Sequence, residues 1–195
     1  MDKDLKGLME FIELLNKFQR IERKLHAVGE ERNENDAEHS YELAMAAWYI
    51  IETKKLNLDK NRAVLYALIH DFVEVHAGDT PAFHTDLRQT KVEREMQALK
   101  KLENEFPEVD KIWKEIREYE KLENEEAKFV YALDKIIPMI NGYHDGGRSW
   151  KRDKITYEMD MDYKKDKVRL SPVVEKYFNN LLELLKKEKH LFLQE

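Results

Sequence analysis

His70, Asp71 and Glu74 are the residues whose types and spacing most directly predict chemistry in this chain. They interrupt an apolar helix pattern in residues 67–81, Ala-Leu-Ile-His-Asp-Phe-Val-Glu-Val-His-Ala-Gly-Asp-Thr-Pro. On a helix, His70 and Glu74 share a face, and Asp71 is near enough for all three to converge on one cleft. Charges buried in such a run are costly unless they are paired or bind a metal. We therefore predict a functional site in this stretch.

A second histidine stands at the start of a predicted central helix. Asn35 followed three residues later by Glu38 is a capping-box pattern, so His39 falls in the first turn of that helix. Residues 41–51 are apolar on nearly all sides, which is typical of a helix in the centre of a bundle. Taken alone, His39 would be interpreted as a core or capping histidine. It becomes a candidate ligand only together with the other residues.

A lone carboxylate in another apolar helix pattern is the next candidate. Asp134 is the only acid in residues 129–140, and Pro138 has no N–H to give to the Asp134 carbonyl. A helix kink is therefore expected at Asp134. An acid in an apolar run and a lost backbone hydrogen bond coincide at this residue, as is typical of functional sites. The alternative is a surface ion pair between Asp134 and Lys135. The long apolar run around Asp134 favours the buried site.

Together, these side chains predict a divalent-metal site between three helices. Two imidazoles and two carboxylates leave room for water on a six-coordinate ion. One ion of Mn²⁺, Co²⁺, Ni²⁺, Fe²⁺ or Mg²⁺ suits such a site better than a closed structural Zn²⁺. The four candidate ligands are His39, His70, Asp71 and Asp134. A cation held there would polarise a phosphoryl oxygen and lower the pKa of its water, which is the chemistry of phosphoester hydrolysis.

The elements that must position these residues are predicted to be helices in one domain covering residues 1–195. Helix patterns occupy residues 5–15, 41–51, 63–77, 92–99, 107–119, 129–140 and 171–190. A metal-site core of about residues 12–140 is followed by an irregular segment, 141–169, and the C-terminal helix, 171–190. Residues 20–36 are polar and are interpreted as a solvated loop. Gly78 and Pro81 are expected to end the helix that carries His70.

Composition excludes several classes of protein. The 195 residues contain no cysteine, so neither disulfides nor thiolate metal sites are available. The net charge of −6 argues against a nucleic-acid surface. The N-terminus lacks the apolar stretch of a signal peptide, and the longest uncharged apolar run, residues 43–51, is far shorter than the roughly 20 residues that span a bilayer. We expect a cytoplasmic protein without nucleic-acid or membrane partners.

The order of the candidate ligands resembles that of the HD superfamily of metal-dependent phosphohydrolases. The strings that look like its bacterial and archaeal 5'-deoxynucleotidase branch are Glu38-His39-Ser40, His70-Asp71-Phe72-Val73-Glu74-Val75 with Gly78-Asp79, and Ala132-Leu133-Asp134-Lys135. The resemblance runs from about residue 12 to the last helix. It implies an all-α orthogonal helical bundle, one divalent metal on the four candidate ligands, a homodimer, and removal of phosphate from (deoxy)nucleoside 5'-monophosphates.

The resemblance also assigns roles to three further residues. It maps the catalytic acid onto Glu74, a second functional acid onto Asp79 and a phosphate-contacting arginine onto Arg23. For Asp79 the alternative is a turn residue that bonds its own backbone. The family often has a tryptophan near this arginine, and here His26 stands near that place. The mode of base or sugar recognition therefore stays open.

Three functions remain at this point. The first is a nucleoside 5'-monophosphatase, and the second is another HD phosphohydrolase acting on triphosphates or other small phosphoesters. The third is a helical binding module that keeps a metal only for folding, which Glu74 disfavours because a structural metal needs no general acid. Two related types are disfavoured by the sequence: alarmone hydrolases carry a Glu-Asp pair where Val75 follows Glu74, and dinuclear phosphodiesterases often use adjacent histidines.

Overall fold

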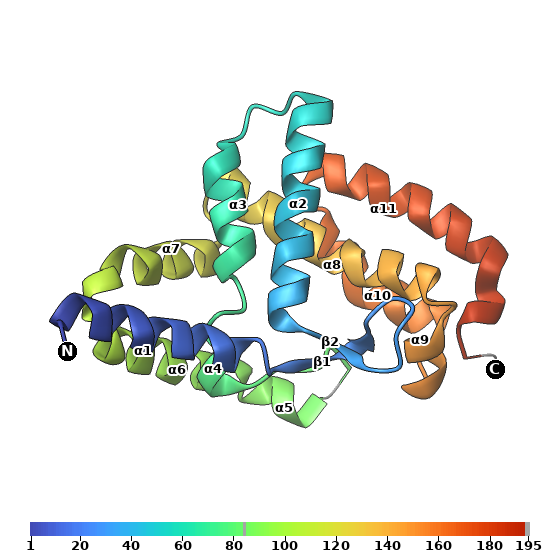
Figure 1. The fold of residues 1–195 in the computed structure, drawn as a ribbon. Coiled ribbons are helices and arrows are strands. Elements are labelled where there is room, and N and C mark those ends of the chain that lie inside the picture. The colour runs from blue at the N-terminus through green and yellow to red at the C-terminus, as the bar shows by residue number, and fades with distance from the viewer. Residues whose placement is uncertain (84, 194–195) are drawn as a thin grey trace.

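A computed structural model describes residues 1–83 and 85–193, with the side chain of Thr85 left out, and shows a bundle of helices with one small hairpin (Figure 1). The prediction of a single domain over residues 1–195 includes residues 84, 194 and 195, which lie outside the described residues. The predicted all-α helical bundle is confirmed. The helices are α1 (Lys3–Phe18), α2 (Asp36–Lys54), α3 (Lys60–Ile69), α4 (Glu74–Ala77), α5 (Thr85–Gln89), α6 (Lys91–Glu105), α7 (Asp110–Lys121), α8 (Glu125–His144), α9 (Arg148–Arg152), α10 (Tyr157–Val168) and α11 (Pro172–Leu185). Two 3₁₀ helices, η1 (Pro107–Val109) and η2 (Lys186–Leu191), complete them.

The centre of the bundle is α8, which packs against α2, α3, α10 and α11. Figure 1 shows α8 passing behind the adjacent pair α2 and α3. The buried side chains of α8 include Ala132, Leu133, Ile136, Ile137 and Met139. Helices α2 and α3 pack against each other, and both bury small residues, which allow helix axes to approach closely; these are Ala44, Ala47, Ala63 and Ala67. The core therefore fixes the three elements that carry the candidate ligands.

The start of α2 is set by the capping box that the sequence predicts. The Asn35 side chain accepts a hydrogen bond from the Glu38 backbone N–H at 3.0 Å, and the Glu38 side chain accepts one from the Asn35 N–H at 3.0 Å. This reciprocal pair satisfies two backbone donors that no helical carbonyl can reach. His39 is consequently held in the first turn of α2, as predicted.

The predicted loop at residues 20–36 contains a hairpin instead. Strand β1 (Glu22–His26) pairs with β2 (Asn33–Asn35) in an antiparallel arrangement. Both strands are short and strongly polar, so they lack the alternation of apolar residues by which a half-buried strand is recognised. Polar side chains on these strands are buried against the site, which composition alone does not indicate.

The prediction of an irregular segment over residues 141–169 is wrong. Helix α8 continues to His144, and α9 and α10 follow. Two glycines with positive φ, Gly146 (66°) and Gly147 (73°), make only a tight turn between α8 and α9. Helix α10 is too polar to show an apolar stripe, because its inward face includes a buried ion pair, described below, among few apolar residues. The C-terminal helix begins at Pro172 as expected and is followed by η2.

The helix predicted to run through His70 to Ala77 is broken. Helix α3 ends at Ile69, and the backbone N–H groups of Phe72 and Glu74 bond to carbonyls three residues back, at 3.1 and 2.8 Å. This tighter turn separates α3 from the short α4. His70 and Asp71 therefore lie in this turn, and Glu74 lies at the start of α4. The three side chains do not share one continuous helix.

Candidate metal centre and active site

His39 and Asp134 meet between α2 and α8. The His39 Nε2 atom lies 2.9 Å from Asp134 Oδ1, and the His39 side chain is 0% exposed. Burial, with the nearby positive charge of Arg23, lowers the pKa of His39 to about 4. The imidazole is therefore neutral at pH 7, which is the form that binds a metal. Pro138 lies inside α8 without ending the helix.

His70 and Asp71 supply the other two candidate ligand atoms. The Nδ1–H of His70 donates to the carbonyl of Ala67 at 2.9 Å, so Nε2 is left with its lone pair pointing into the site. His70 Nε2 lies 2.9 Å from Asp71 Oδ2 and 3.9 Å from Asp134 Oδ1. The four predicted ligands thus converge from α2, the turn after α3, and α8.

The geometry of this cluster fits a divalent ion. Ligand atoms of His39, His70 and Asp71 all lie within 4.8 Å of one another. Neighbouring ligands on an octahedral ion with bonds of about 2.1 Å lie about 3 Å apart, close to the 2.9 Å separations seen here. The buried Nε2 of His70 lies 2.9 Å from Asp71 Oδ2, but with the ring proton on Nδ1 it has no hydrogen to donate to that oxygen. Two buried acceptors facing each other are unfavourable, and a cation between them would satisfy both.

A cavity of about 410 Å³ opens beside the cluster, within the usual range for small-molecule sites. Asp71 and Asp134 lie on its wall, whereas both histidines are buried behind it. The predicted functional residues Arg23, Glu74 and Asp79 line the same cavity. The structure thus brings all seven predicted site residues to one place.

Glu74 is placed as a proton donor would need to be. It is the first residue of α4, its side chain faces the cavity wall, and it is 2% exposed. Burial, followed by the negative charges of Asp71 and Asp36, raises the pKa of Glu74 well above its ordinary value. A raised pKa favours the protonated form of the carboxyl group, which is the form that a general acid needs.

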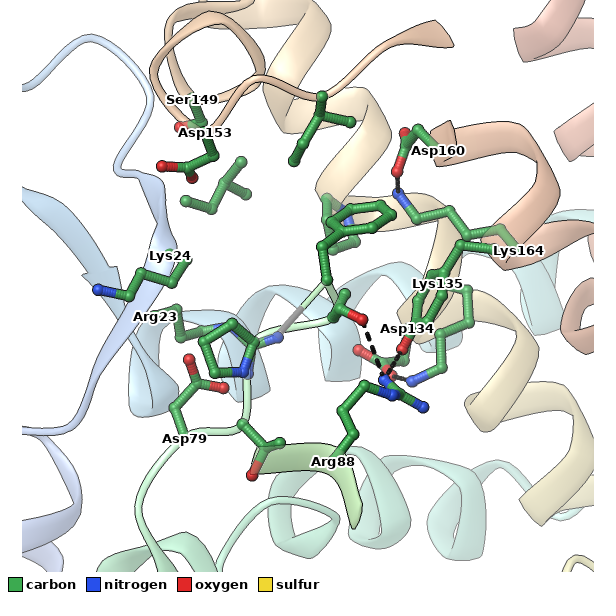
Figure 2. A pocket seen from close by; sticks show the side chains of 18 of the residues that line it. Arg23, Lys24, Asp79, Arg88, Asp134, Lys135, Ser149, Asp153, Asp160 and Lys164 are labelled. Atoms are coloured by element: carbon green, nitrogen blue, oxygen red, sulfur yellow. Dashed lines mark hydrogen bonds and ion pairs between the residues drawn. The ribbon is translucent and has the colours of Figure 1, made fainter. Parts of the chain in front are cut away.

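Asp79 follows Gly78, whose φ of 73° turns the chain out of α4. The Asp79 carboxylate faces the cavity across from Arg88 (Figure 2). Burial raises the pKa of Asp79. This location is consistent with a role at the cavity rather than in its own turn. His76, two residues beyond Glu74, instead pairs with Glu105 at 2.9 Å and belongs to the contact between α4 and α6.

Arg23 on β1 is enclosed by three carboxylates. Its Nη1 lies 2.7 Å from Asp71 Oδ2 and 3.2 Å from Asp36 Oδ1, and its Nε lies 3.7 Å from Glu34 Oε2. The guanidinium thus holds the predicted ligand Asp71 in place. Sequence reasoning missed Asp36 and Glu34. Asp36 precedes His39 by three residues on one helix face, which is the signal that could have found it.

Removing Arg23 should destabilise the protein most at high pH. Burial raises the pKa values of Asp36 and Glu34 to about 7, and Arg23 opposes this shift. Without Arg23 these pKa values rise further, and a carboxyl with a raised folded-state pKa loses stability as pH rises through that pKa. We expect Arg23→Ala to lose about 3–5 kcal/mol of unfolding free energy above pH 7 and less at pH 5, measured by urea denaturation.

The control for this experiment is Arg169→Ala, since Arg169 forms an exposed pair with Asp166 at 2.8 Å. Exposed pairs contribute about 0–1 kcal/mol, so this variant should match the parent at both pH values. An Arg23→Ala protein as stable as the parent at pH 8 would mean that the buried carboxylates are stabilised by something other than Arg23.

His26 supports the cavity wall instead of facing the cavity. Its backbone N–H donates to Ser149 Oγ at 2.8 Å, and its Nδ1 lies 3.0 Å from the same oxygen and 3.5 Å from Asp145 Oδ2. These contacts tie β1 to α9. Aromatic side chains reach the cavity from elsewhere, namely Phe83, Trp150 and Tyr163.

The wall formed by α9 and α10 was not predicted, because residues 141–169 were interpreted as irregular. It includes Ser149, Trp150, Asp153, Ile155, Asp160, Tyr163 and Lys164. The signal that could have found it is Gly142, which lies inside α8, two residues beyond the predicted end of that helix at residue 140. A Cβ at Gly142 would lie 2.6 Å from the Trp150 ring, so the glycine is required by the close approach of α9 to α8.

A helical bundle with histidines and aspartates converging from three elements defines a class of metal-binding hydrolase. The family model of the HD domain matches residues 15–175 of this sequence. The chain therefore belongs to the HD-domain family, and its prediction as a metal-dependent hydrolase of that family is confirmed.

Several relatives share the name 5'-deoxynucleotidase HDDC2. The mouse protein is 31% identical over 147 residues, which is 71% of each chain, and the bovine protein is 32% identical over 148 residues, covering 72% of this chain and 69% of its own. Among solved structures, a predicted metal-dependent phosphohydrolase from Magnetospirillum magnetotacticum MS-1 superposes with a TM-score of 0.83 at 27% identity, covering 97% of this chain and 96% of that one. A conserved hypothetical protein from Pyrococcus furiosus shares the fold, with a TM-score of 0.65 at 22% identity over 92% of this chain and 99% of that one.

Proposed function

We propose that this protein is a phosphomonoesterase that hydrolyses (deoxy)nucleoside 5'-monophosphates to nucleoside and phosphate. The observation that carries the proposal is the convergence of His39, His70, Asp71 and Asp134 beside a cavity that the buried Glu74 also lines. The relatives named 5'-deoxynucleotidase support the choice of substrate. A structural metal site would need neither the cavity nor the proton donor.

The four ligands would hold one divalent ion, whose identity among Mn²⁺, Co²⁺, Ni²⁺, Fe²⁺ and Mg²⁺ is not fixed by this ligand set. When bound, such an ion supplies a Lewis acid for the phosphoryl oxygen and lowers the pKa of the attacking water. Glu74 would donate its proton to the leaving 5'-oxygen. Arg23 would keep Asp71 oriented, and Asp79, on the same cavity, would position the attacking group or the sugar.

The proposal is tested by measuring phosphate release from nucleoside mono-, di- and triphosphates with each metal added in turn. We expect monophosphates to be hydrolysed, chelation to abolish the activity, and Mn²⁺ or Co²⁺ to restore more of it than Mg²⁺, because imidazole favours the softer ions. Full activity of a protein shown to be metal-free would overturn the metal's role. Preference for triphosphates would favour the other HD phosphohydrolase chemistry.

The remaining sequence-based expectations belong to the same proposal. We propose one HD-type domain over residues 1–195, a homodimer, a cytoplasmic location and no nucleic-acid partner. Large apolar side chains exposed on α2 would be available to a second copy; they are Tyr41, Met45, Trp48 and Tyr49. Within the described residues, none of the helices combines the length and the hydropathy needed to cross a membrane.

A further inference from the structure

Basic side chains around the cavity differ in how their charges are compensated. Six of them line it: Arg23, Lys24, Arg88, Lys91, Lys135 and Lys164. On the side of β1 and α6, Arg23 is enclosed by carboxylates and Lys91 pairs with Glu95 at 3.2 Å. The cations on this side, apart from the exposed Lys24, are therefore already engaged by the protein itself.

On the opposite side, four basic side chains lie near one another, and two of them, Arg88 and Lys167, contact the ring of Tyr163. We call this group, Arg88, Lys135, Lys164 and Lys167, the basic wall. Arg88 donates to the Tyr163 hydroxyl and its guanidinium lies 5.0 Å from the ring centroid, while the Lys167 ammonium lies 2.9 Å from that centroid. Figure 2 shows Arg88, Lys135 and Lys164 on the same side of the cavity as Asp134, with Arg23 and Lys24 across from them.

The basic wall has fewer carboxylates than cations. Lys164 pairs with Asp160 at 2.5 Å, and Lys135 pairs with Asp134. In the part of the chain that the structure describes, Arg88 and Lys167 form no ion pair. Burial, followed by the positive charges of Lys135, Arg88 and Lys164, lowers the pKa of Lys167 to about 7. Arg88 is therefore a full positive charge that no carboxylate among the described residues neutralises, and its neighbours leave Lys167 only partly charged near pH 7.

The basic wall adjoins the proposed metal position, because Lys135 contacts Asp134 Oδ2 while Asp134 Oδ1 faces His39. Asp79 lies across the cavity from Arg88 (Figure 2). A phosphate dianion beside the metal would be attracted to the basic wall, where cations outnumber carboxylates.

We propose that the basic wall is the phosphate subsite, in which Arg88 and Lys135 contact the phosphate group of the substrate while Lys164 and Lys167 add to the positive field. This inference rests on the proposed function. A phosphate bound at the basic wall would direct its leaving oxygen toward Glu74. Arg23 would then act as a positioning residue for Asp71. Arg88 is suited to the contact because its planar guanidinium can present two N–H donors to one phosphate.

The test is calorimetric titration of inorganic phosphate into the full chain, with metal content measured in each sample. Arg88→Gln removes one charge from an exposed position, and Lys135→Met keeps the length of the side chain while removing the ammonium, which lies 4.7 Å from the centroid of the Tyr131 ring. Each variant should raise the phosphate Kd about 10- to 100-fold, as expected for one lost charge-assisted hydrogen bond. Lys24→Met, a cation on the opposite side of the cavity, is the matched control and should leave the Kd within about 2-fold of the parent.

Two results would overturn the subsite. One is an unchanged phosphate Kd in Arg88→Gln, a substitution at an exposed position that removes no packing from the core. The other is an equal weakening of phosphate binding by Lys24→Met, which would indicate that phosphate responds only to the summed positive charge around the cavity. The outcome is separate from the proposed function: a parent that hydrolyses no nucleoside monophosphate but shows the variant effects on phosphate binding keeps the subsite and loses the substrate.

Discussion

Replacing Asp134 by alanine should remove the metal and reduce phosphatase activity to background. The variant loses one of four ligands, which should cost more than the roughly 10- to 100-fold in metal affinity that follows loss of an outer partner. Elemental analysis after gel filtration measures the metal directly. Thermal unfolding provides a second measurement, because an ion that binds only the folded state raises the melting temperature.

The design must separate metal loss from the loss of the Lys135 ion pair, since Asp134 contacts both His39 and Lys135. The parent should melt at a higher temperature with added Mn²⁺ than with chelator, whereas Asp134→Ala should melt at the same temperature in both. Asp162→Ala, which removes an exposed carboxylate on α10, should respond to Mn²⁺ like the parent. If Asp134→Ala still binds one metal ion per chain, Asp134 is not a ligand, and the alternative of a simple ion pair with Lys135 is correct.

Replacing Glu74 by glutamine should lower kcat by about 10²- to 10⁴-fold, the usual range for a lost proton-transfer group. Glutamine keeps the size of the side chain and removes only the transferable proton. Because Glu74 is outside the ligand set, metal content and melting temperature should stay near those of the parent. The measurement is steady-state kinetics on a deoxynucleoside monophosphate with metal quantified in the same samples.

A matched control for this second experiment is Glu93→Gln on the exposed surface of α6, which should leave kcat unchanged. A fully active Glu74→Gln enzyme would remove Glu74 from the mechanism. The proton-transfer role would then pass to Asp79, whose carboxyl faces the same cavity with a raised pKa.

The four candidate ligands were predictable because polar residues in apolar helix patterns are conspicuous. The structure brings His70 and Asp71 into the cluster even though the continuous helix expected for them is broken after Ile69. Their convergence depends on the meeting of α2, α3 and α8, which the apolar patterns of those helices indicate. It does not depend on the local backbone between His70 and Glu74.

The surroundings of the ligands were not predictable from the same signals. Asp36 lies in a charged segment, where only its spacing of three residues from His39 distinguishes it from other acids, and its burial follows from the position of Arg23 on β1. Asp160 and Lys164 are buried as a mutual pair at 2.5 Å, so α10 shows no apolar stripe. Side chains that satisfy one another in the interior are indistinguishable, in one sequence, from side chains that face water.

The distance along the chain between His39 and Asp134 has a consequence for the order of folding. The two residues are 95 positions apart yet lie 2.9 Å from each other in the folded protein. Closing a loop of this length costs entropy before any contact can offset it, so pairs so remote form late. The hairpin and the α2–α3 pair can assemble from neighbouring segments, but the site exists only after α8 has docked. Metal capture is therefore a marker of the completed core, and a nascent chain that has not yet emerged through α8 has no site in which to hold the ion.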